Sequence, residues 1–384
     1  PCTLNGSVFG KSWYGVGCVD PCDPALDGPV CAHGQVVALE LAWNNVSGVL
    51  PQSVVNILKK LDMLDLSHNS LSGTIPTEVG KLRVLKYFQL GDNALSGTIP
   101  TEVRTIGSHM PRDGHEYASE DVDCNATEAD AHPTMVRQSV NVACKYVGPR
   151  MIGPKVFDVG HNQLNGTLPT TMGELINLKT VDISHNSALG GECCTEESSW
   201  YDRSFYDYPT AIPTEIGQLW KLQALRTHNS NHLRYLPTQL GSLRDLVWLE
   251  ASGNGSIPNS NQISGTIPSQ IGRLKNILRV VAQDNQISGS IPLQIRGMSA
   301  LMHVELQGNK LSGSIPDSYG GMTGLRYWDS FDNKLVGDLP PSVFELKELT
   351  ELYIQNEHSD AIRTYYCRER IEQSAPVSYT HLTL

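Results

Sequence analysis

The 384-residue sequence contains no long hydrophobic run and no excess of positive charge. A transmembrane helix needs about 18 or more consecutive apolar residues, so we expect no membrane span within this sequence. Lys and Arg number 29 against 40 Asp and Glu, which gives a formal net charge of −11. This balance argues against nucleic acid as a partner, because phosphate binding requires a basic stripe, and it favours a cationic or neutral partner.

The sequence also lacks the motifs on which common enzymes depend. It has no sequence motif of a Ser-His-Asp catalytic triad, no glycine-rich loop that would bind a phosphate, and no kinase signature. Its glycines fall at regularly spaced positions that a scaffold would need. We therefore expect no catalytic residue, no cofactor and no metal site, and we predict that the chain is not an enzyme.

Cysteine is absent from the regular part of the chain. The nine cysteines gather near the two ends and in two irregular segments, which favours disulfides formed in an oxidising compartment. The chain begins at Pro1 without Met, so we expect either that a leader was removed or that the sequence is a fragment. An extracellular or cell-surface location is supported by N-glycosylation sequences at Asn5, Asn45, Asn125, Asn165 and Asn254.

What the sequence does contain is an internal repeat, clearest between residues 276 and 340. Apolar residues recur at fixed offsets, Gly and Pro close each unit, and one Asn recurs every 24 residues, at Asn261, Asn285, Asn309 and Asn333. Before Asn309, apolar and polar residues alternate, which predicts a short strand. In that strand we expect Val304 and Leu306 to point inward, and His303 and Glu305 to point outward.

One such unit buries too little apolar surface to be stable alone, so the units must stack into a solenoid with a continuous core. The turn at Asn309 would let the Asn side chain bond the backbone of the next coil, where an unpaired buried amide would cost free energy. Gly313 and Pro316 suit a tight return on the convex side. These recurring residues are therefore predicted to be structural.

The repeat template, L-x-x-L-x-L-x-x-N-x-L-S-G-x-I-P, resembles that of plant-type leucine-rich-repeat proteins, including the ectodomains of receptor-like proteins and receptor kinases. The resemblance implies an α/β repeat solenoid, a right-handed horseshoe or superhelix with short parallel strands on its concave face. It extends over residues 36–357, in about eleven repeats. Residues 1–35 carry the string SWYGVGC and resemble the Cys-rich N-terminal cap of such ectodomains.

Four cysteines in this cap allow three pairings. The family pattern implies that Cys2 pairs with Cys18, which leaves Cys22 with Cys31. A zinc site with C-x₃-C spacing is the alternative interpretation of the same cysteines.

Two inserts interrupt the 24-residue repeat. Asn93 and Asn162 are 69 residues apart, so residues 101–153 hold an insertion of roughly 20 residues if two repeats are spanned or about 45 if one is; we favour the longer insertion, which contains Cys124 and Cys144. This insert is either a surface loop stapled by a disulfide or an island that contacts a ligand, as in some plant-type receptor ectodomains. Residues 192–210 either pack on the convex side or contact a partner through the rings of Trp200, Tyr201, Phe205, Tyr206 and Tyr208.

Residues 358–384 form an irregular tail. Its last residues, VSYTHLTL, resemble read-through of a sequencing adapter, so we expect this end not to be native.

The outward strand positions are predicted to form the binding surface. The position between the two inward residues of each strand is acidic in most repeats, which fits either a solvated face or a basic ligand. Rings and histidines occupy neighbouring positions, and rings among acids on a strand surface suit capture of a peptide or protein. The predicted ligand-binding residues are Tyr87, His161, Arg226, Trp248, Glu250, His303, Glu305, Tyr327, Asp329 and Phe331.

The resemblance implies an extracellular recognition module, the ectodomain of a receptor-like protein, that binds a peptide, protein or glycan. A co-receptor is a further expected partner, and any membrane contact would run through a segment outside this sequence. Two alternatives stay open: a soluble inhibitor or cell-wall protein resembling polygalacturonase-inhibiting proteins, and an ectodomain fragment of a receptor kinase. A stop codon soon after Cys367 in the full transcript would favour the inhibitor, whereas a hydrophobic span would favour the receptor.

Overall fold

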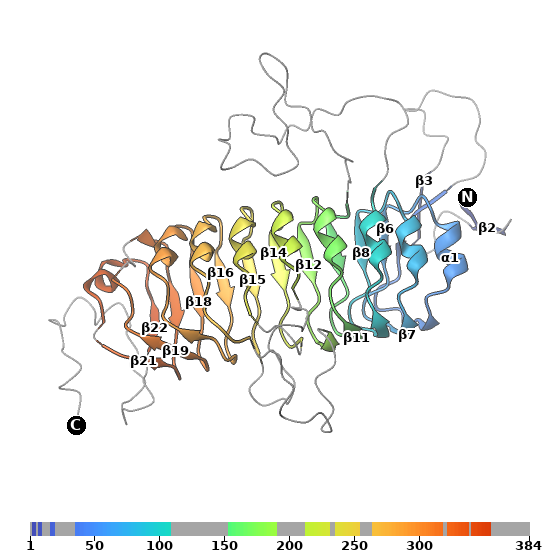
Figure 1. The fold of residues 1–384 in the computed structure, drawn as a ribbon. Coiled ribbons are helices and arrows are strands. Elements are labelled where there is room, and N and C mark those ends of the chain that lie inside the picture. Colours follow the sequence, from blue (N-terminus) through green and yellow to red (C-terminus); the bar gives the residue numbers. More distant parts are fainter. Residues whose placement is uncertain are drawn as a thin grey trace, which may run out of the picture.

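The computed structural model describes residues 2–4, 7–9, 16–19, 35–108, 153–189, 212–230, 235–253, 263–317, 321–337 and 339–354, with the backbone alone before residue 36. These residues form a curved solenoid of stacked coils that runs from the N-terminal to the C-terminal end (Figure 1). The first two strands, β1 (Cys2–Leu4) and β2 (Ser7–Phe9), form a separate antiparallel pair. The predicted leucine-rich-repeat solenoid is confirmed.

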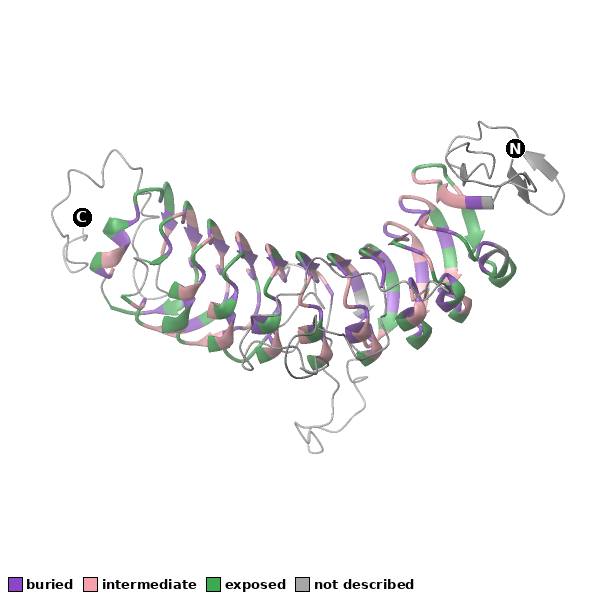
Figure 2. Cartoon of the chain, turned by 90° about the horizontal axis from the view of Figure 1, so that it is seen from above, coloured by how far each residue is buried: buried purple, intermediate pink, exposed green. Residues whose placement is uncertain are grey.

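The largest sheet has twelve strands and follows the concave side of the curve (Figure 2). At its N-terminal edge, β3 (Val16–Val19) pairs antiparallel with β4, so the segment before residue 36 adds a strand to the end of the array. Each of the other pairings in the sheet is parallel. These parallel strands are β4 (Gln35–Glu40), β6 (Met63–Asp65), β8 (Tyr87–Gln89), β10 (Val156–Asp158), β12 (Thr180–Asp182), β14 (Ala224–Arg226), β15 (Trp248–Glu250), β16 (Arg279–Val281), β18 (His303–Glu305), β20 (Tyr327–Asp329) and β22 (Glu351–Tyr353).

A second row of short strands follows the turns that end the concave strands. It forms one five-stranded and one three-stranded sheet, and the described residues of the β14 and β15 coils contribute no strand to either. The first sheet contains β5 (Ser47–Val49), β7 (Ser70–Thr74), β9 (Ala94–Thr98), β11 (Asn162–Gly166) and β13 (Asn186–Leu189). The second contains β17 (Ser288–Gly289), β19 (Lys310–Gly313) and β21 (Lys334–Leu335).

Short helices return the chain along the convex side (Figure 2). The first coil uses an α-helix, α1 (Gln52–Ile57), and the later coils use 3-10 helices of five residues, each preceded by a proline at its N-cap. Proline suits that position because its fixed φ matches the extended N-cap and no amide donor is needed there. These helices are η1 (Thr77–Lys81), η2 (Thr101–Thr105), η3 (Thr170–Glu174), η4 (Thr214–Gln218), η5 (Thr238–Ser242), η6 (Ser269–Arg273), η7 (Leu293–Gly297) and η9 (Pro341–Glu345).

The core is one continuous apolar column inside the coils. In each three-residue concave strand the middle residue is buried, as the alternation predicts, and its neighbours stay at least partly exposed except for Ala224 and Val281, which are also buried. Val304 and Leu306 are buried and His303 and Glu305 face outward, so the expectation for this strand is confirmed. Large rings fill the same inward position at Phe88, Phe157 and Trp328.

The recurring asparagines join adjacent coils. Asn93 accepts a hydrogen bond from Leu71 N–H at 2.9 Å and donates to the carbonyl oxygen of Leu66 at 2.9 Å, and both of these groups belong to the preceding coil. The expectation that such an Asn bonds the next coil was therefore wrong in direction. The reason is that the buried side-chain amide points toward the preceding coil in the sequence. At Ser230, which replaces Asn, the hydroxyl still donates to Ile183 O at 2.9 Å.

Glycines on the convex helices permit close approach of neighbouring coils. A Cβ placed on Gly241 would lie 2.3 Å from Gln270 O, and one on Gly272 would lie 2.0 Å from Gln294 O. Both obstacles are backbone atoms, so a side chain there could be accommodated only by moving a coil. The glycine at this position therefore sets the spacing of the helix row.

We expect Gly272→Ala to destabilise the array by about 1–3 kcal/mol or more, because the added methyl group overlaps backbone of the next coil. Urea denaturation followed by circular dichroism measures the loss. Gly324→Ala is the matched control, since its Cβ would meet its nearest neighbour, Leu301 O, at 3.9 Å. Equal stability losses in the two variants would contradict the role assigned to Gly272.

The first insert does not separate the coils on either side of it. Strand β8 pairs directly with β10, with Phe88 opposite Phe157, and β9 pairs with β11. The additional residues therefore leave the array after η2 and rejoin it just before β10. Residues 109–152 of this insert, residues 190–211 with the second insert, and the tail after residue 354 lie outside the described residues, as do the side chains of all the cysteines.

Candidate functional site

The concave sheet presents two outward columns of side chains in exact register across its strands. The first residue of each strand lies beside the first residue of the next, and the third residues are aligned in the same way. Tyr87, Trp248, His303 and Tyr327 belong to the first column, and Arg226, Glu250, Glu305 and Asp329 belong to the second. His161 and Phe331 lie in the turns that follow β10 and β20.

The structure brings several of the predicted binding residues together in one chain of ion pairs. Arg226 contacts Asp182 at 3.7 Å and Glu250 at 3.1 Å. Arg279 continues the chain, with nitrogens 4.0 Å from Glu250 and 2.9 Å from Glu305, and Glu305 also contacts His303. Exposed ion pairs contribute little stability, but a network of alternating charge holds these side chains in place.

An aromatic stack continues the network toward the C-terminal end. The rings of His303 and Tyr327 stack with centroids 4.4 Å apart, and Tyr353 lies 5.6 Å from Tyr327. The Tyr327 hydroxyl donates to Asp329 at 3.4 Å, and Asp329 also accepts the backbone N–H of Phe331 at 2.9 Å. Tyr87 and His161 lie on the other half of the array, away from this group. A binding role for any of the ten residues stays a prediction.

Many of the acidic residues in the second column form hydrogen bonds that stabilise the fold. Asp65, Asp158, Asp182 and Asp329 each accept a hydrogen bond, at 2.9–3.0 Å, from the backbone N–H two residues further on. A carboxylate in this position closes the turn after the strand, as short polar side chains commonly do. The frequency of Asp in this column is therefore explained in part by the scaffold, and a basic ligand is not required to account for it.

A third column lies one residue before most of the ladder positions, and of its members only His161 was among the residues predicted to bind a ligand. Its members have φ between 50° and 60°, a region that Asn, Asp and His enter more readily than other residues. The signal was available in the sequence, because polar and ring residues recur just before the ladder position. This turn column contains Trp43, His68, Asp92, His161, His185, Asn229, Asp284 and Asp332.

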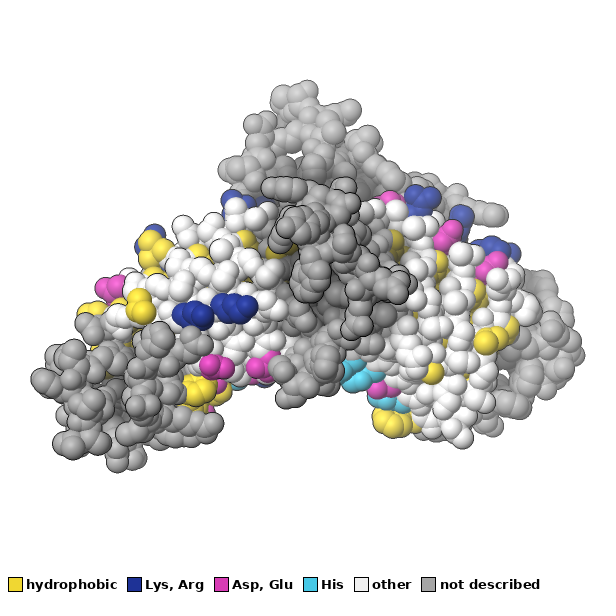
Figure 3. Space-filling view, turned by 60° about the horizontal axis from the view of Figure 1, so that its bottom comes forward, with side chains coloured by type: hydrophobic (Ala, Val, Ile, Leu, Met, Phe, Trp, Pro, Cys, Tyr) yellow, Lys and Arg dark blue, Asp and Glu magenta, His cyan; other side chains and the backbone are white. Residues whose placement is uncertain are grey.

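Members of the turn column contact one another from coil to coil. Trp43 stacks on His68 at 3.9 Å, and Asp92 lies between His68 at 3.1 Å and His161 at 3.6 Å. His161 in turn stacks on His185 at 3.8 Å. Figure 3 shows histidine and acidic side chains gathered at one edge of the molecule. The concave sheet is therefore bordered on this side by a continuous row of rings and a carboxylate.

His185, which belongs to this row, and Asp158, which lies beside it, have displaced pKa values. Burial and the neighbouring Asp182 raise the pKa of Asp158 to about 6, although the Gly160 N–H opposes the shift. Burial and the neighbouring His161 and His228 lower the pKa of His185 to about 4, against the opposing effect of Asp182 and Asp92. The middle of the array thus holds a carboxyl group and an imidazole that both resist charging.

We expect His185 to make stability fall on acidification. Its pKa is about 6.5 in the unfolded chain and about 4 in the folded one, so only the unfolded state gains this proton between those values. His185→Asn, which tolerates the positive φ, should therefore lose less thermal stability than the wild type between pH 7 and pH 4.5. Melting temperatures across this pH range test the expectation, and parallel curves for the two proteins would contradict it.

Asp158→Asn is a control for which the expected change of stability with pH has the opposite sign. The folded-state pKa of Asp158 is raised from 3.8 to about 6, so its charge destabilises the protein above pH 6 and ceases to do so below about 3.8. Asn still accepts the Gly160 N–H. The variant should be more stable than the wild type at neutral pH, and this advantage should shrink as the pH falls.

Two of the predicted glycosylation sites can be placed. Asn45 and Asn165 are both exposed, Asn45 in the turn before β5 and Asn165 in β11. Asn5, Asn125 and Asn254 lie outside the described residues, as do the five rings of the second insert. The modification and the insert contacts remain predictions.

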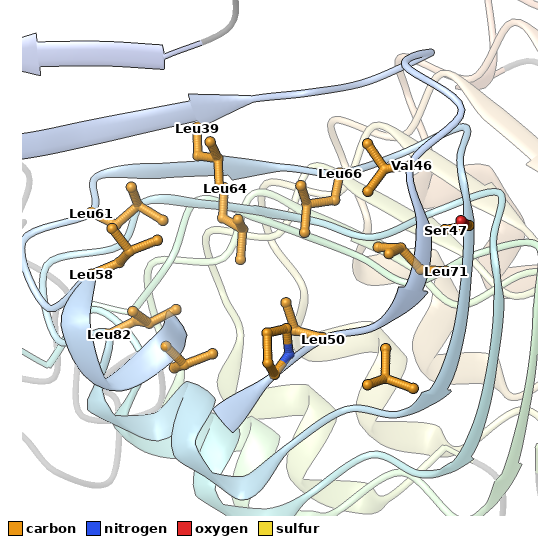
Figure 4. A pocket seen from close by; sticks show the side chains of 13 residues that line it. Leu39, Val46, Ser47, Leu50, Leu58, Leu61, Leu64, Leu66, Leu71 and Leu82 are labelled. Carbon is orange, nitrogen blue, oxygen red and sulfur yellow. The ribbon is translucent and has the colours of Figure 1, made fainter. Parts of the chain in front are cut away.

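An apolar cavity of about 150 Å³ lies inside the first coils, near β5 and α1 (Figure 4). Leucines dominate its lining, and apart from Ser47 no polar side chain lines it. Ligand sites usually combine apolar walls with a few orienting polar groups, so we assign this space to core packing. Within the described ranges, no group of three or more His, Cys, Asp or Glu could hold a metal ion, and no helix has the length and hydrophobicity of a membrane span.

Comparison with known proteins agrees with this architecture. The Leucine Rich Repeat family model matches residues 60–82, and no curated protein matches the chain. The chain is similar to the ectodomain of the Arabidopsis receptor kinase HAESA in complex with an N-terminally extended IDA peptide hormone, with a TM-score of 0.62 and 23% identity, over 91% of this chain and 45% of that one. It is equally similar, with a TM-score of 0.62 and 23% identity over 91% and 44%, to HAESA in complex with IDA and the co-receptor SERK1.

At this level of identity the likeness concerns the fold, and the chain spans less than half the length of both HAESA chains. The period of 24 residues, the Asn ladder and the second row of strands agree with the family match. The chain therefore has the leucine-rich-repeat fold.

Proposed function

We propose that the chain is an extracellular recognition module, the ectodomain of a receptor-like protein, which binds a peptide or protein on its concave face and performs no catalysis. The observation that carries the proposal is Trp248, which is 45% exposed in the middle of the concave sheet. An exposed Trp buries a large area at low entropy cost when a partner covers it, and Trp is enriched among residues that dominate binding.

The surroundings of Trp248 support this role. Arg226, Glu250 and Arg279 lie on the same or adjacent strands and are held by the ion-pair network, so the surface is organised before a partner arrives. Preorganised side chains lower the entropy cost of binding. HAESA, which has the same fold, is described in complex with a peptide hormone and a co-receptor. The exposed Asn45 and Asn165 suit a glycosylated extracellular chain.

The full chain, immobilised and panned with a library of random 12-residue peptides, tests the proposal. We expect a small set of related peptides to be enriched and to lose at least about tenfold in affinity for Trp248→Ala, as for a central binding residue. Val336→Ala is the matched control, because Val336 is also exposed but lies on the turn side beyond β21. Absence of any enriched peptide, or equal affinity for both variants, would contradict the proposal.

A further inference from the structure

The middle of the concave face has a pattern of large and small side chains that no other part of the described sheet shares. Across strands β8, β10, β12, β14 and β15, the first column reads Tyr87, Val156, Thr180, Ala224 and Trp248, in continuous register. Two large rings therefore stand about 19 Å apart, at about 4.8 Å per strand, with three smaller side chains between them. We call the surface of these five strands the central strip.

Two carboxylates lie side by side in the second column of the central strip. Asp158 and Asp182 are paired directly across β10 and β12. Glycines of the neighbouring coils pack closely against both carboxylates: a Cβ on Gly91 would lie 2.8 Å from Asp158 Oδ1, and one on Gly160 would lie 2.8 Å from Asp182 Oδ1. Any larger residue at these glycines would collide with the carboxylates, so glycine is needed there for Asp158 and Asp182 to keep their positions.

The nearest cation is already engaged. Arg226 lies 3.7 Å from Asp182, but its Nε donates to Glu250 at 3.1 Å. Asp158 has the raised pKa described above, which burial and Asp182 cause and which Arg226 only partly opposes. In the second column of the strip and the turn column beside it, Asp92, Asp158, Asp182 and Glu250 outnumber this one guanidinium by four to one.

Charge differs across the width of the strip. Lys86, Lys155 and Lys179 precede the first column on consecutive strands, and Lys86 contacts Asp62 at 3.2 Å. His161, His185 and His228 border the opposite, turn side together with Asp92. A cation brought to the strip is therefore attracted toward the turn side and repelled from the start of the strands, which gives a bound partner a preferred orientation.

We propose that the central strip docks an extended peptide segment that places one Arg or Lys side chain on Asp158 and Asp182, with flanking apolar residues against Tyr87 and Trp248. This inference rests on the proposed function and names the chemistry of its partner. A peptide is favoured over a neutral glycan because the second column of the strip holds more carboxylates than cations, and a sugar hydroxyl would not neutralise them. A charge-assisted hydrogen bond to a carboxylate is about twice as strong as a neutral one.

The same random 12-residue library, panned on the full chain, provides the test. We expect the enriched peptides to contain Arg or Lys at one fixed position, and a synthetic peptide of that sequence to bind. The double variant Asp158→Asn, Asp182→Asn should weaken this peptide by at least about tenfold and remove the basic preference. Asn at both positions still accepts the Gly160 and Ser184 N–H groups, so the fold is retained.

Asp65→Asn is the matched control. Asp65 occupies the same column and accepts the Ser67 N–H at 3.0 Å, but it lies on β6, outside the central strip. This variant should bind the peptide as the wild type does. Melting temperatures of both variants establish that they are folded.

The outcomes separate this inference from the proposed function. Enriched peptides without a fixed basic residue, or equal affinity for the double variant and the wild type, would overturn the inference while leaving concave-face recognition intact. Binding of neutral oligosaccharides that is lost in Trp248→Ala, without binding of basic peptides, would also overturn it. If no peptide is enriched at all, the proposed function itself fails.

Discussion

Phe157→Ala is expected to cost about 3–5 kcal/mol in the free energy of unfolding, the largest effect of any single change considered for this protein. Phe157 is fully buried, and its ring stacks on Phe88 with centroids 5.3 Å apart. The two residues are paired across β8 and β10, which flank the first insert. Removing one ring leaves a cavity at the junction between two coils, where stability in a repeat array depends on nearest-neighbour contacts.

Equilibrium urea denaturation followed by fluorescence and circular dichroism measures this loss. Phe157→Leu is the control, because it retains most of the apolar volume and should cost no more than about 1.5 kcal/mol. If both variants lost the same stability, the stacked ring pair would not be the source of the effect.

Asn162→Ala is expected to cost about 2–4 kcal/mol. The buried Asn162 accepts the Leu95 N–H at 2.9 Å and donates to Leu90 O at 3.0 Å, across the same pair of coils. Leu90 O also accepts from Asn93, so it keeps a partner after the substitution. The Leu95 N–H loses its Asn162 acceptor inside the core, and an unpaired buried donor carries most of the expected cost.

Gln163→Ala serves as the control for this position, since Gln163 is exposed on β11 and should change stability by less than about 0.5 kcal/mol. Amide hydrogen exchange adds a local readout. We expect faster exchange at Leu95 in Asn162→Ala and unchanged exchange there in Gln163→Ala. Wild-type protection of this amide in Asn162→Ala would show that another acceptor replaces the side chain.

The array could be predicted from the sequence because its constraints are local and repeated. The spacing of the ladder asparagines and the alternation around Val304 specify which residues point inward, and the structure confirms both. Proline before each convex helix and glycine at Gly313 have backbone requirements that the residue type itself reveals. These features need no knowledge of distant contacts.

The details of the candidate site were harder to predict because they arise between coils. The sequence shows an acidic column, but not that Asp182 closes its own turn or that Arg226 is engaged by Glu250. It shows histidines near the ladder position, but not that His161 and His185 stack. Register brings such residues together, and register is a property of the assembled sheet. The close packing of Asp158 against Gly91 likewise depends on a residue of the neighbouring coil.

The direct pairing of β8 with β10 also bears on how the chain folds. Most neighbouring coils close a loop of about 24 residues, whereas Asn93 and Asn162 are 69 positions apart in the sequence. Loop closure becomes about 0.6 kcal/mol more costly with each doubling of length, so this junction is about 1 kcal/mol harder to close than an ordinary one. Folding that spreads from coil to coil on either side should therefore slow here, and the two halves of the solenoid should join late.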